Sequence, residues 1–143
     1  MKSIVIFVLL STLCMAQNQV RTVTRTVAEF GGWERELATA KSAADRAAFL
    51  TDDFEERLCA APSTPVPRDQ WLASPPSNWS LSQEAVHEYG DVSIYSALAD
   101  DGKPARISLV DVWKRTESDW KLAVRYRCPA TGAQPQGTIQ KRY

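Results

Sequence analysis

Histidine, glycine loops and net charge are all scarce in this sequence, and each shortage excludes a class of function. The 143 residues include one histidine, which leaves too few ligands for the three or four that a metal site usually takes. The six glycines are dispersed and form no phosphate-cradling loop. Basic and acidic residues number 17 each, so no excess charge attracts nucleic acid. We therefore expect no cofactor, no metal and no nucleic-acid partner.

Long apolar runs are missing too, apart from one short run near the start. Lys2 precedes the apolar residues Ile4–Leu10, and the small residue Ala16 stands before a polar stretch, a pattern typical of a signal peptide. The run is shorter than the roughly 20 residues of a spanning helix. We predict a signal peptide over residues 1–16, a periplasmic or secreted protein, and no membrane contact after cleavage. A lipoprotein anchored at Cys14 is the weaker alternative, because Leu13 is bulky for that motif.

Cysteine is rare, and the predicted cleavage leaves only Cys59 and Cys128 in the mature chain. An exported chain with two cysteines favours a disulfide between them. Two separately buried thiols remain the alternative, because pairing depends on a Cα–Cα distance that the sequence does not give.

Helical spacing dominates the first half of the chain. Apolar residues at this spacing, Trp33 among them, predict a helix over residues 26–41, followed by a second over residues 43–50. A proline-rich loop then precedes a short helix at Arg68–Ala73. We expect residues 17–25 to be a polar lead, 26–130 to be the folded domain and 131–143 to be a flexible tail.

From Ala85 to Ala130 the pattern changes to four strands joined by short turns. Gly90-Asp91 and Asp101-Gly102 indicate two-residue turns, and Thr116–Asp119 indicates a four-residue connection. The expected fold class is α+β, with N-terminal helices packed on a strongly curved antiparallel sheet of the cystatin-like cone type.

These turns fix a register, because side chains alternate between the two faces of a sheet. With these turns, residue 94 pairs with 109 and residue 111 pairs with 124. The face expected to carry the core then holds Ala85, His87, Tyr89, Val92, Ile94, Ser96, Ile107, Leu109, Asp111, Trp113, Leu122, Val124 and Tyr126. The opposite face, expected to include Arg125 and Arg127, is half apolar, and such a surface is often covered by a partner subunit.

Asp111 is the candidate catalytic residue of the predicted inner face. Its neighbours Leu109 and Trp113 would desolvate the carboxylate and raise its pKa, so that it could act as an acid or base. Tyr126 or Tyr89 would donate a hydrogen bond to an oxyanion. A structural hydrogen-bonded pair and a ligand-pocket role are the alternatives for Asp111.

Further side chains are candidates for binding a ligand, with structural packing as the alternative reading for each. They are His87, Tyr89, Ser96, Trp113 and Trp33. No nucleophile-elbow signature surrounds Ser96, so a serine hydrolase is not indicated.

The order of several short motifs resembles the nuclear-transport-factor-2-like superfamily, which includes the SnoaL-like and ketosteroid-isomerase-like proteins. Beyond Trp33 and Arg68–Ala73, the motifs are Thr51–Phe54, Tyr89–Val92, Asp111–Arg115 and Trp120–Tyr126. The similarity is greatest to small exported members of largely unassigned function, in which a histidine often stands at the position of Tyr126. The resemblance implies a conical pocket between helices and sheet, and a homodimer through the outer sheet face.

The function expected from the sequence is therefore that of an exported small domain. It would bind a small, largely apolar molecule in the conical pocket and dimerise through the outer face. The alternative is an isomerase, cyclase or hydratase that uses Asp111 as acid/base with Tyr126 or Tyr89 as oxyanion donor, as ketosteroid isomerases do. A purely structural dimerisation domain is the third reading.

Overall fold

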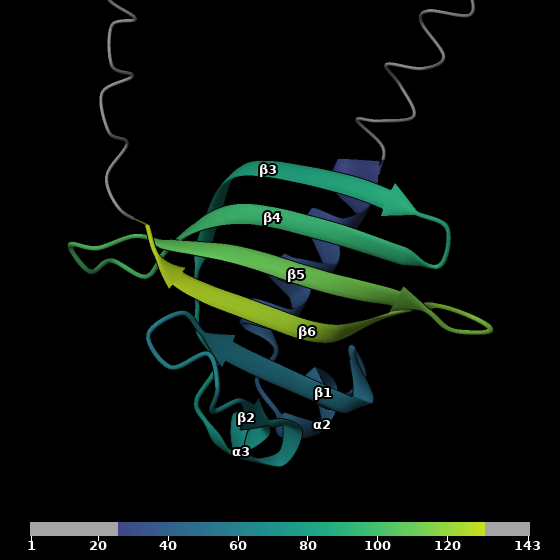
Figure 1. Ribbon diagram of the computed structural model, residues 1–143, viewed down its shortest axis with the longest axis horizontal. Coiled ribbons are helices and arrows are strands. Elements are labelled where there is room, and N and C mark those ends of the chain that lie inside the picture. Colours follow the sequence, from purple (N-terminus) through teal and green to yellow (C-terminus); the bar gives the residue numbers. More distant parts are fainter. Residues whose placement is uncertain (1–25, 131–143) are drawn as a thin grey trace, which may run out of the picture.

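Residues 26–130 are described by the computed structural model, and they form helices packed against one face of a curved six-stranded sheet (Figure 1). The signal peptide, the lead and the tail predicted over residues 1–16, 17–25 and 131–143 lie outside the described residues. Export therefore stays a prediction. Among the described residues, no helix is long and apolar enough to cross a membrane.

The long first helix covers residues 26–39 and lies behind the sheet in Figure 1. Its buried stripe includes Phe30, Leu37 and Ala38, which recur at helical spacing. A short helix, α2 (Ala43–Ala47), follows, and the Ser42 hydroxyl caps it by accepting a hydrogen bond from the Asp45 amide at 3.0 Å. This helix is shorter than predicted because the next strand begins at residue 50.

The third helix, α3, spans Arg68–Ala73, as the sequence predicts. The strands are β1 (Leu50–Leu58), β2 (Val66–Pro67), β3 (Ser80–Tyr89), β4 (Val92–Asp100), β5 (Ile107–Arg115) and β6 (Trp120–Pro129). Their order in the sheet is β2-β1-β6-β5-β4-β3. The β1–β6 pair is parallel, so the sheet is mixed, whereas a wholly antiparallel sheet was predicted.

The predicted two-residue turn at Asp101-Gly102 is wrong. Strand pairing ends at Ala99 and Ile107, and between them Asp100 accepts a hydrogen bond from the Gly102 amide at 2.8 Å. The longer loop moves the partner of Ile94 from residue 109 to Val112. Because this shift is an odd number of residues, it turns Ile94 to the outer face.

A β-bulge in β6 corrects the predicted register a second time. Trp113 pairs with Leu122, as the four-residue connection predicts, but Val112 pairs with Val124, which leaves Ala123 as the extra residue. Beyond the bulge Asp111 lies opposite Arg125 instead of residue 124. Arg125 therefore points inward, and the neighbours predicted to be inside, Val124 and Tyr126, point outward.

The core lies between the long helix and the inner sheet face. Phe30 contacts Trp33, Trp113 and Trp120 edge to face, with ring centroids 4.8–5.8 Å apart. At the other end of the sheet a disulfide joins Cys59 to Cys128, with a Cα–Cα distance of 5.0 Å. The predicted disulfide is thus present, and it links the end of β1 to the end of β6.

Candidate functional site

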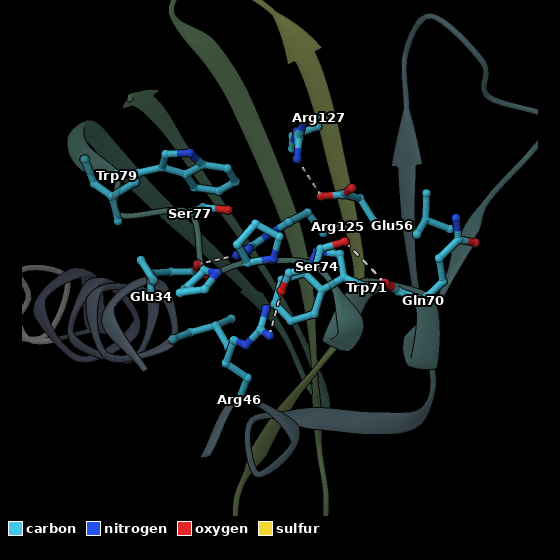
Figure 2. Close-up of a pocket in the computed structure, with 16 residues that line it drawn as sticks. Glu34, Arg46, Glu56, Gln70, Trp71, Ser74, Ser77, Trp79, Arg125 and Arg127 are labelled. Atoms are coloured by element: carbon cyan, nitrogen blue, oxygen red, sulfur yellow. Dashed lines mark hydrogen bonds and ion pairs between the residues drawn. The ribbon is translucent and has the colours of Figure 1, made fainter. Parts of the chain in front are cut away.

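A cavity of about 290 Å³ opens between the long helix, α2, α3, the loop of residues 74–79 and the inner face of β6 (Figure 2). It holds roughly ten water-sized volumes of about 30 Å³ each. Its wall mixes apolar and charged side chains, and three of the latter are arginines, Arg46, Arg125 and Arg127.

The innermost part of the site is a buried ion cluster in which Arg125 bridges two carboxylates. Its Nε donates to both oxygens of Asp111 at 3.0 and 3.1 Å, and its Nη2 donates to Asp111 Oδ2 at 2.6 Å. The same Nη2 donates to Glu34 Oε2 at 2.5 Å. The side chains of Arg125, Glu34 and Asp111 are 3%, 2% and 0% exposed, so the cluster is shielded from bulk water.

Burial and charge act on this cluster in opposite directions. Burial raises the pKa of Glu34 well above its ordinary value, and the negative charge of Asp111 raises it further, against the lowering effect of Arg125. Burial by itself would lower the pKa of Arg125, but Asp111 and Glu34 together raise it, so the guanidinium stays charged. Trp113 also binds Glu34, because its indole Nε1 donates to Oε1 at 3.1 Å.

Two tryptophans separate the three arginines of the cavity wall. The guanidinium carbon of Arg125 lies 5.9 Å from the ring centroid of Trp71 and 5.4 Å from that of Trp79. The guanidinium carbon of Arg46 lies 5.3 Å from the Trp71 centroid, and that of Arg127 lies 5.7 Å from the Trp79 centroid. Each contact is a cation–π interaction, worth about 0.5–2 kcal/mol depending on desolvation. The alternation holds the positive groups apart and directed at one space.

The cavity wall is fixed to the backbone at two places. Arg46 Nη2 donates to the carbonyl oxygens of Leu72 and Ser74 at 2.6 and 2.8 Å, which holds the end of α3 and the start of the loop (Figure 2). On the opposite side Arg127 Nη1 donates to Glu56 Oε1 at 3.3 Å, across the β6–β1 pair.

Arg125 keeps one donor group for a ligand. No acceptor among residues 26–130 binds its Nη1, and that nitrogen is not among the fully buried unpaired atoms of this part of the chain. Since Arg125 lines the cavity, Nη1 is the accessible edge of an otherwise paired guanidinium.

Most of the site residues predicted from the sequence do not lie together in the structure. Asp111 does point inward, but it lies behind Arg125 and does not line the cavity. Tyr126 and Tyr89 are 39% and 64% exposed, so the prediction that they face the core is wrong. His87 is exposed as well, because it lies opposite Ile94 on the outer face.

The three remaining candidates also lie away from the cavity. Ser96 pairs with Val110 on the outer face. Trp113 is fully buried in the core. Trp33 belongs to the aromatic cluster at the far end of the long helix and lines a shallow surface depression there with Trp120.

Arg125 and Arg127 were missed because the predicted register placed both on the outer face. One signal could have found Glu34: it follows Phe30 by four residues and precedes Leu37 by three, so it falls on the buried stripe of its helix. A carboxylate on such a stripe needs a buried partner.

No group of three or more histidine, cysteine, aspartate or glutamate side chains within residues 26–130 is arranged to hold a metal ion. The two innermost carboxylates, Glu34 and Asp111, are instead occupied by Arg125.

Solved structures with the same architecture are numerous. An NTF2-like protein with a cystatin-like fold from Novosphingobium aromaticivorans is 13% identical, with a TM-score of 0.58 over 85% of this chain and 91% of that chain. An NTF2-like protein from Cytophaga hutchinsonii is 13% identical, with a TM-score of 0.57 over 76% and 97%. The CaMKII hub homology domain of Chlamydomonas reinhardtii is 17% identical, with a TM-score of 0.57 over 74% of this chain and 98% of that chain.

This chain has the NTF2-like cone fold. The fold expected from the sequence resemblance is thereby confirmed, and at these identities the similarity extends to the fold alone. A scan of family models found none that matches the chain, and a search of curated proteins found no match. The function of this NTF2-like domain must therefore be argued from its cavity.

Proposed function

We propose that this domain is a binding protein for a small organic anion, whose negative group is held at the free edge of Arg125. The single observation that carries the proposal is the accessible Nη1 of a guanidinium that Asp111 and Glu34 otherwise fix in place. A preorganised guanidinium loses little entropy on binding, which is why arginine suits carboxylate recognition.

The rest of the cavity supports a ligand with an apolar body and one charged end. The indole rings of Trp71 and Trp79 contribute apolar surface, and Arg46 and Arg127 extend the positive potential to both sides. This differs from the largely apolar ligand expected from the sequence, because the inward turn of β6 brings arginines to the wall. The volume of about 290 Å³ is at the lower end for ligand pockets, which favours a compact molecule.

Asp111 is not the base of an isomerase in this proposal. Both of its oxygens accept hydrogen bonds from Arg125, and it is fully buried behind that side chain. Tyr126 and Tyr89 lie on the opposite face of the sheet, so neither hydroxyl can stabilise an oxyanion beside it. The binding function needs neither contact. We further propose that the protein acts after export, as its N-terminal sequence predicts.

The experiment compares carboxylates with their uncharged amides on the purified protein. Benzoate is paired with benzamide and propionate with propionamide, and the shift in melting temperature is measured, since a ligand that binds the native state raises it. We expect stabilisation by the carboxylates and none by the amides. Arg127→Met should weaken carboxylate binding, whereas Arg57→Met, on the other face of the neighbouring strand, should not. Equal effects of acid and amide would contradict the proposal.

A second candidate function is assembly, which a separate observation favours. Ile94, Val112 and Val124 form an aliphatic row across the outer sheet face, and all three are partly exposed within the described residues. Within residues 26–130, no helix covers that face (Figure 1). Some structural neighbours are association domains, which is compatible with a homodimer. We propose that a second copy of this chain packs on the row.

Sedimentation velocity tests the dimer at micromolar concentration. Val112→Lys introduces a charge in the centre of the row and should convert the dimer to a monomer. Ser118→Lys adds the same charge in the exposed β5–β6 loop and should leave the dimer intact. A wild-type protein that sediments as a monomer would contradict this second function and leave the first untouched.

A further inference from the structure

The carboxylates near the cavity differ in whether each has a cation of its own or shares one. Glu84, on β3, pairs with Arg35 at 2.9 Å, and Glu56 pairs with Arg127 at 3.3 Å. Glu34 and Asp111 share one cation, Arg125, and they share the same nitrogen of it, Nη2. One guanidinium charge cannot neutralise two buried carboxylates, so this pair has an excess negative charge unless one of them holds a proton.

Glu34 is the less closely paired of the two carboxylates. Asp111 receives three hydrogen bonds from Arg125, whereas Glu34 receives one from Arg125 and one from the indole of Trp113. Arg125 is therefore bound more closely to Asp111 than to Glu34. Burial, followed by the negative charge of Asp111, raises the pKa of Glu34, which agrees with the weaker pairing of this carboxylate.

We propose that the cavity binds a monoanion together with one proton, and that Glu34 carries this proton. The inference rests on the proposed function and adds the charge of the ligand and its regulation by pH. Arg125 already has Asp111 as a full counter-ion through Nε and Nη2. An anion at Nη1 places a further negative group on the same guanidinium. If Glu34 were ionised, its negative charge would repel this anion, because Asp111 already neutralises Arg125.

The net charge at the cavity wall and directly behind it leads to the same stoichiometry. Arg46, Arg125, Arg127, Glu34 and Glu56 line this space, and Asp111 lies behind Arg125. With Glu34 protonated the six groups carry a single positive charge, which one monoanion neutralises. With Glu34 ionised they are already neutral, and a bound anion would be uncompensated beside a cluster that is shielded from bulk water.

The other groups packed against Glu34 do not supply an alternative proton site. The Tyr95 hydroxyl on β4 donates to Glu84 at 3.0 Å, and burial followed by that hydrogen bond raises its pKa, so the phenol stays neutral. Trp113 on β5 is a donor only. Among the described residues around the cavity, the remaining ionisable groups are arginines or carboxylates with a cation of their own.

The sign of the coupling follows from linkage. An anion beside Arg125 raises the proton affinity of Glu34, and the proton must by reciprocity raise the affinity for the anion. Affinity is therefore highest below the pKa that Glu34 has in the free protein. Above it, affinity falls by up to tenfold for each pH unit, because one proton is taken up with each anion.

Calorimetric titration with benzoate tests this inference on the mature chain. Titrations at several pH values in two buffers of different ionisation enthalpy give the number of protons taken up. We expect uptake to rise toward one proton per benzoate as the pH passes the pKa of free Glu34. Glu34→Gln, which imitates the protonated side chain, should bind benzoate with a pH-independent affinity and no uptake. The control Glu55→Gln, on the outer face of β1, should behave like wild type.

Each outcome decides between the two proposals. No benzoate binding by wild type at any pH overturns the proposed function and this inference with it. Binding without proton uptake overturns only the inference, as does uptake that persists in Glu34→Gln. Loss of binding in Glu34→Gln, with circular dichroism unchanged, would also overturn it, because the neutral amide should preserve the site.

Discussion

The two faces of the same strands differ in where they place charge. On the inner face Asp111 and Arg125 are almost completely buried and joined to Glu34. On the outer face the neighbouring positions of the same strands, Val112 and Val124, are aliphatic. The polar residues His87 and Tyr126 on that face are exposed to solvent. The candidate site of this domain is thus centred on buried ion pairing, and not on His87 or Tyr126.

Two backbone features cause this difference. The loop between Asp100 and Ile107 sets which residues of β4 point inward, and the bulge at Ala123 sets which residues of β6 do. Either feature alone reverses a strand's faces, because side chains alternate along a strand. The comparison therefore predicts that substitutions on the two faces have very different effects.

The largest effect is expected from Arg125→Met. It removes the cation that two buried carboxylates share, and breaking such a pair from one side costs about 3–5 kcal/mol. Arg57→Met is the matched outer-face control, because it breaks the partly exposed Arg57–Glu55 pair, and a pair at the surface contributes far less to stability. Urea unfolding followed by tryptophan fluorescence measures both. Equal losses for the two variants would remove the distinction between the faces.

A loss of similar or smaller size is expected from removing the disulfide. Cys59 and Cys128 are 69 residues apart, and the bond joins β1 to β6, the parallel pair that both faces share. The variant Cys59→Ser/Cys128→Ser should lose about 2–4 kcal/mol, mainly through the greater entropy of its unfolded chain. Urea unfolding of this variant, and of wild type with and without reductant, measures the loss. A stability unchanged within about 0.5 kcal/mol would show that the sheet needs no such link.

A pH-dependent effect is expected from Glu34. Its pKa is raised in the folded protein, so between the unfolded and the folded value the native state binds the extra proton, and stability falls as pH rises. The slope reaches about 1.4 kcal/mol per pH unit for one proton. Glu34→Gln should remove this slope, and unfolding curves across the pH range measure it. A slope that is the same in both proteins would assign it to another group.

The smallest effects are expected on the outer face. His87→Ala and Tyr126→Phe should each change stability by no more than about 0.5 kcal/mol, because both side chains are exposed. Thermal unfolding at low protein concentration measures the isolated domain. A loss of several kcal/mol from either variant would indicate that the outer face is packed as tightly as the inner one.

The sequence predicted the elements better than it predicted their faces. Helical spacing located the long helix and α3, and alternation located β3 to β6 and the inward side chains Asp111 and Trp113. The Asp101-Gly102 pair suggested a tight hairpin, but Asp100 and Asp101 both accept amide hydrogen bonds, which stabilises a wider loop. Local turn chemistry therefore did not determine the register.

The site depended on features that act over long distances in the chain. The bulge at Ala123 has no sequence signature of its own, because alanine neither requires nor prefers that backbone. Glu34 and Arg125 are 91 residues apart, and only the fold shows that they meet. The tightly buried charges could be suspected from Glu34 on an apolar helical stripe, but their partner could not be named.

The protonation of Glu34 in the folded protein tests this account most directly. Glutamate labelled with ¹³C at the side-chain carboxyl gives one resonance for each residue, and Glu34→Gln identifies the one that belongs to Glu34. We predict that this carboxyl stays protonated to a pH well above the ordinary pKa of a glutamate. Titration of Glu34 at that ordinary value would contradict the buried cluster, and with it the inward position of Arg125.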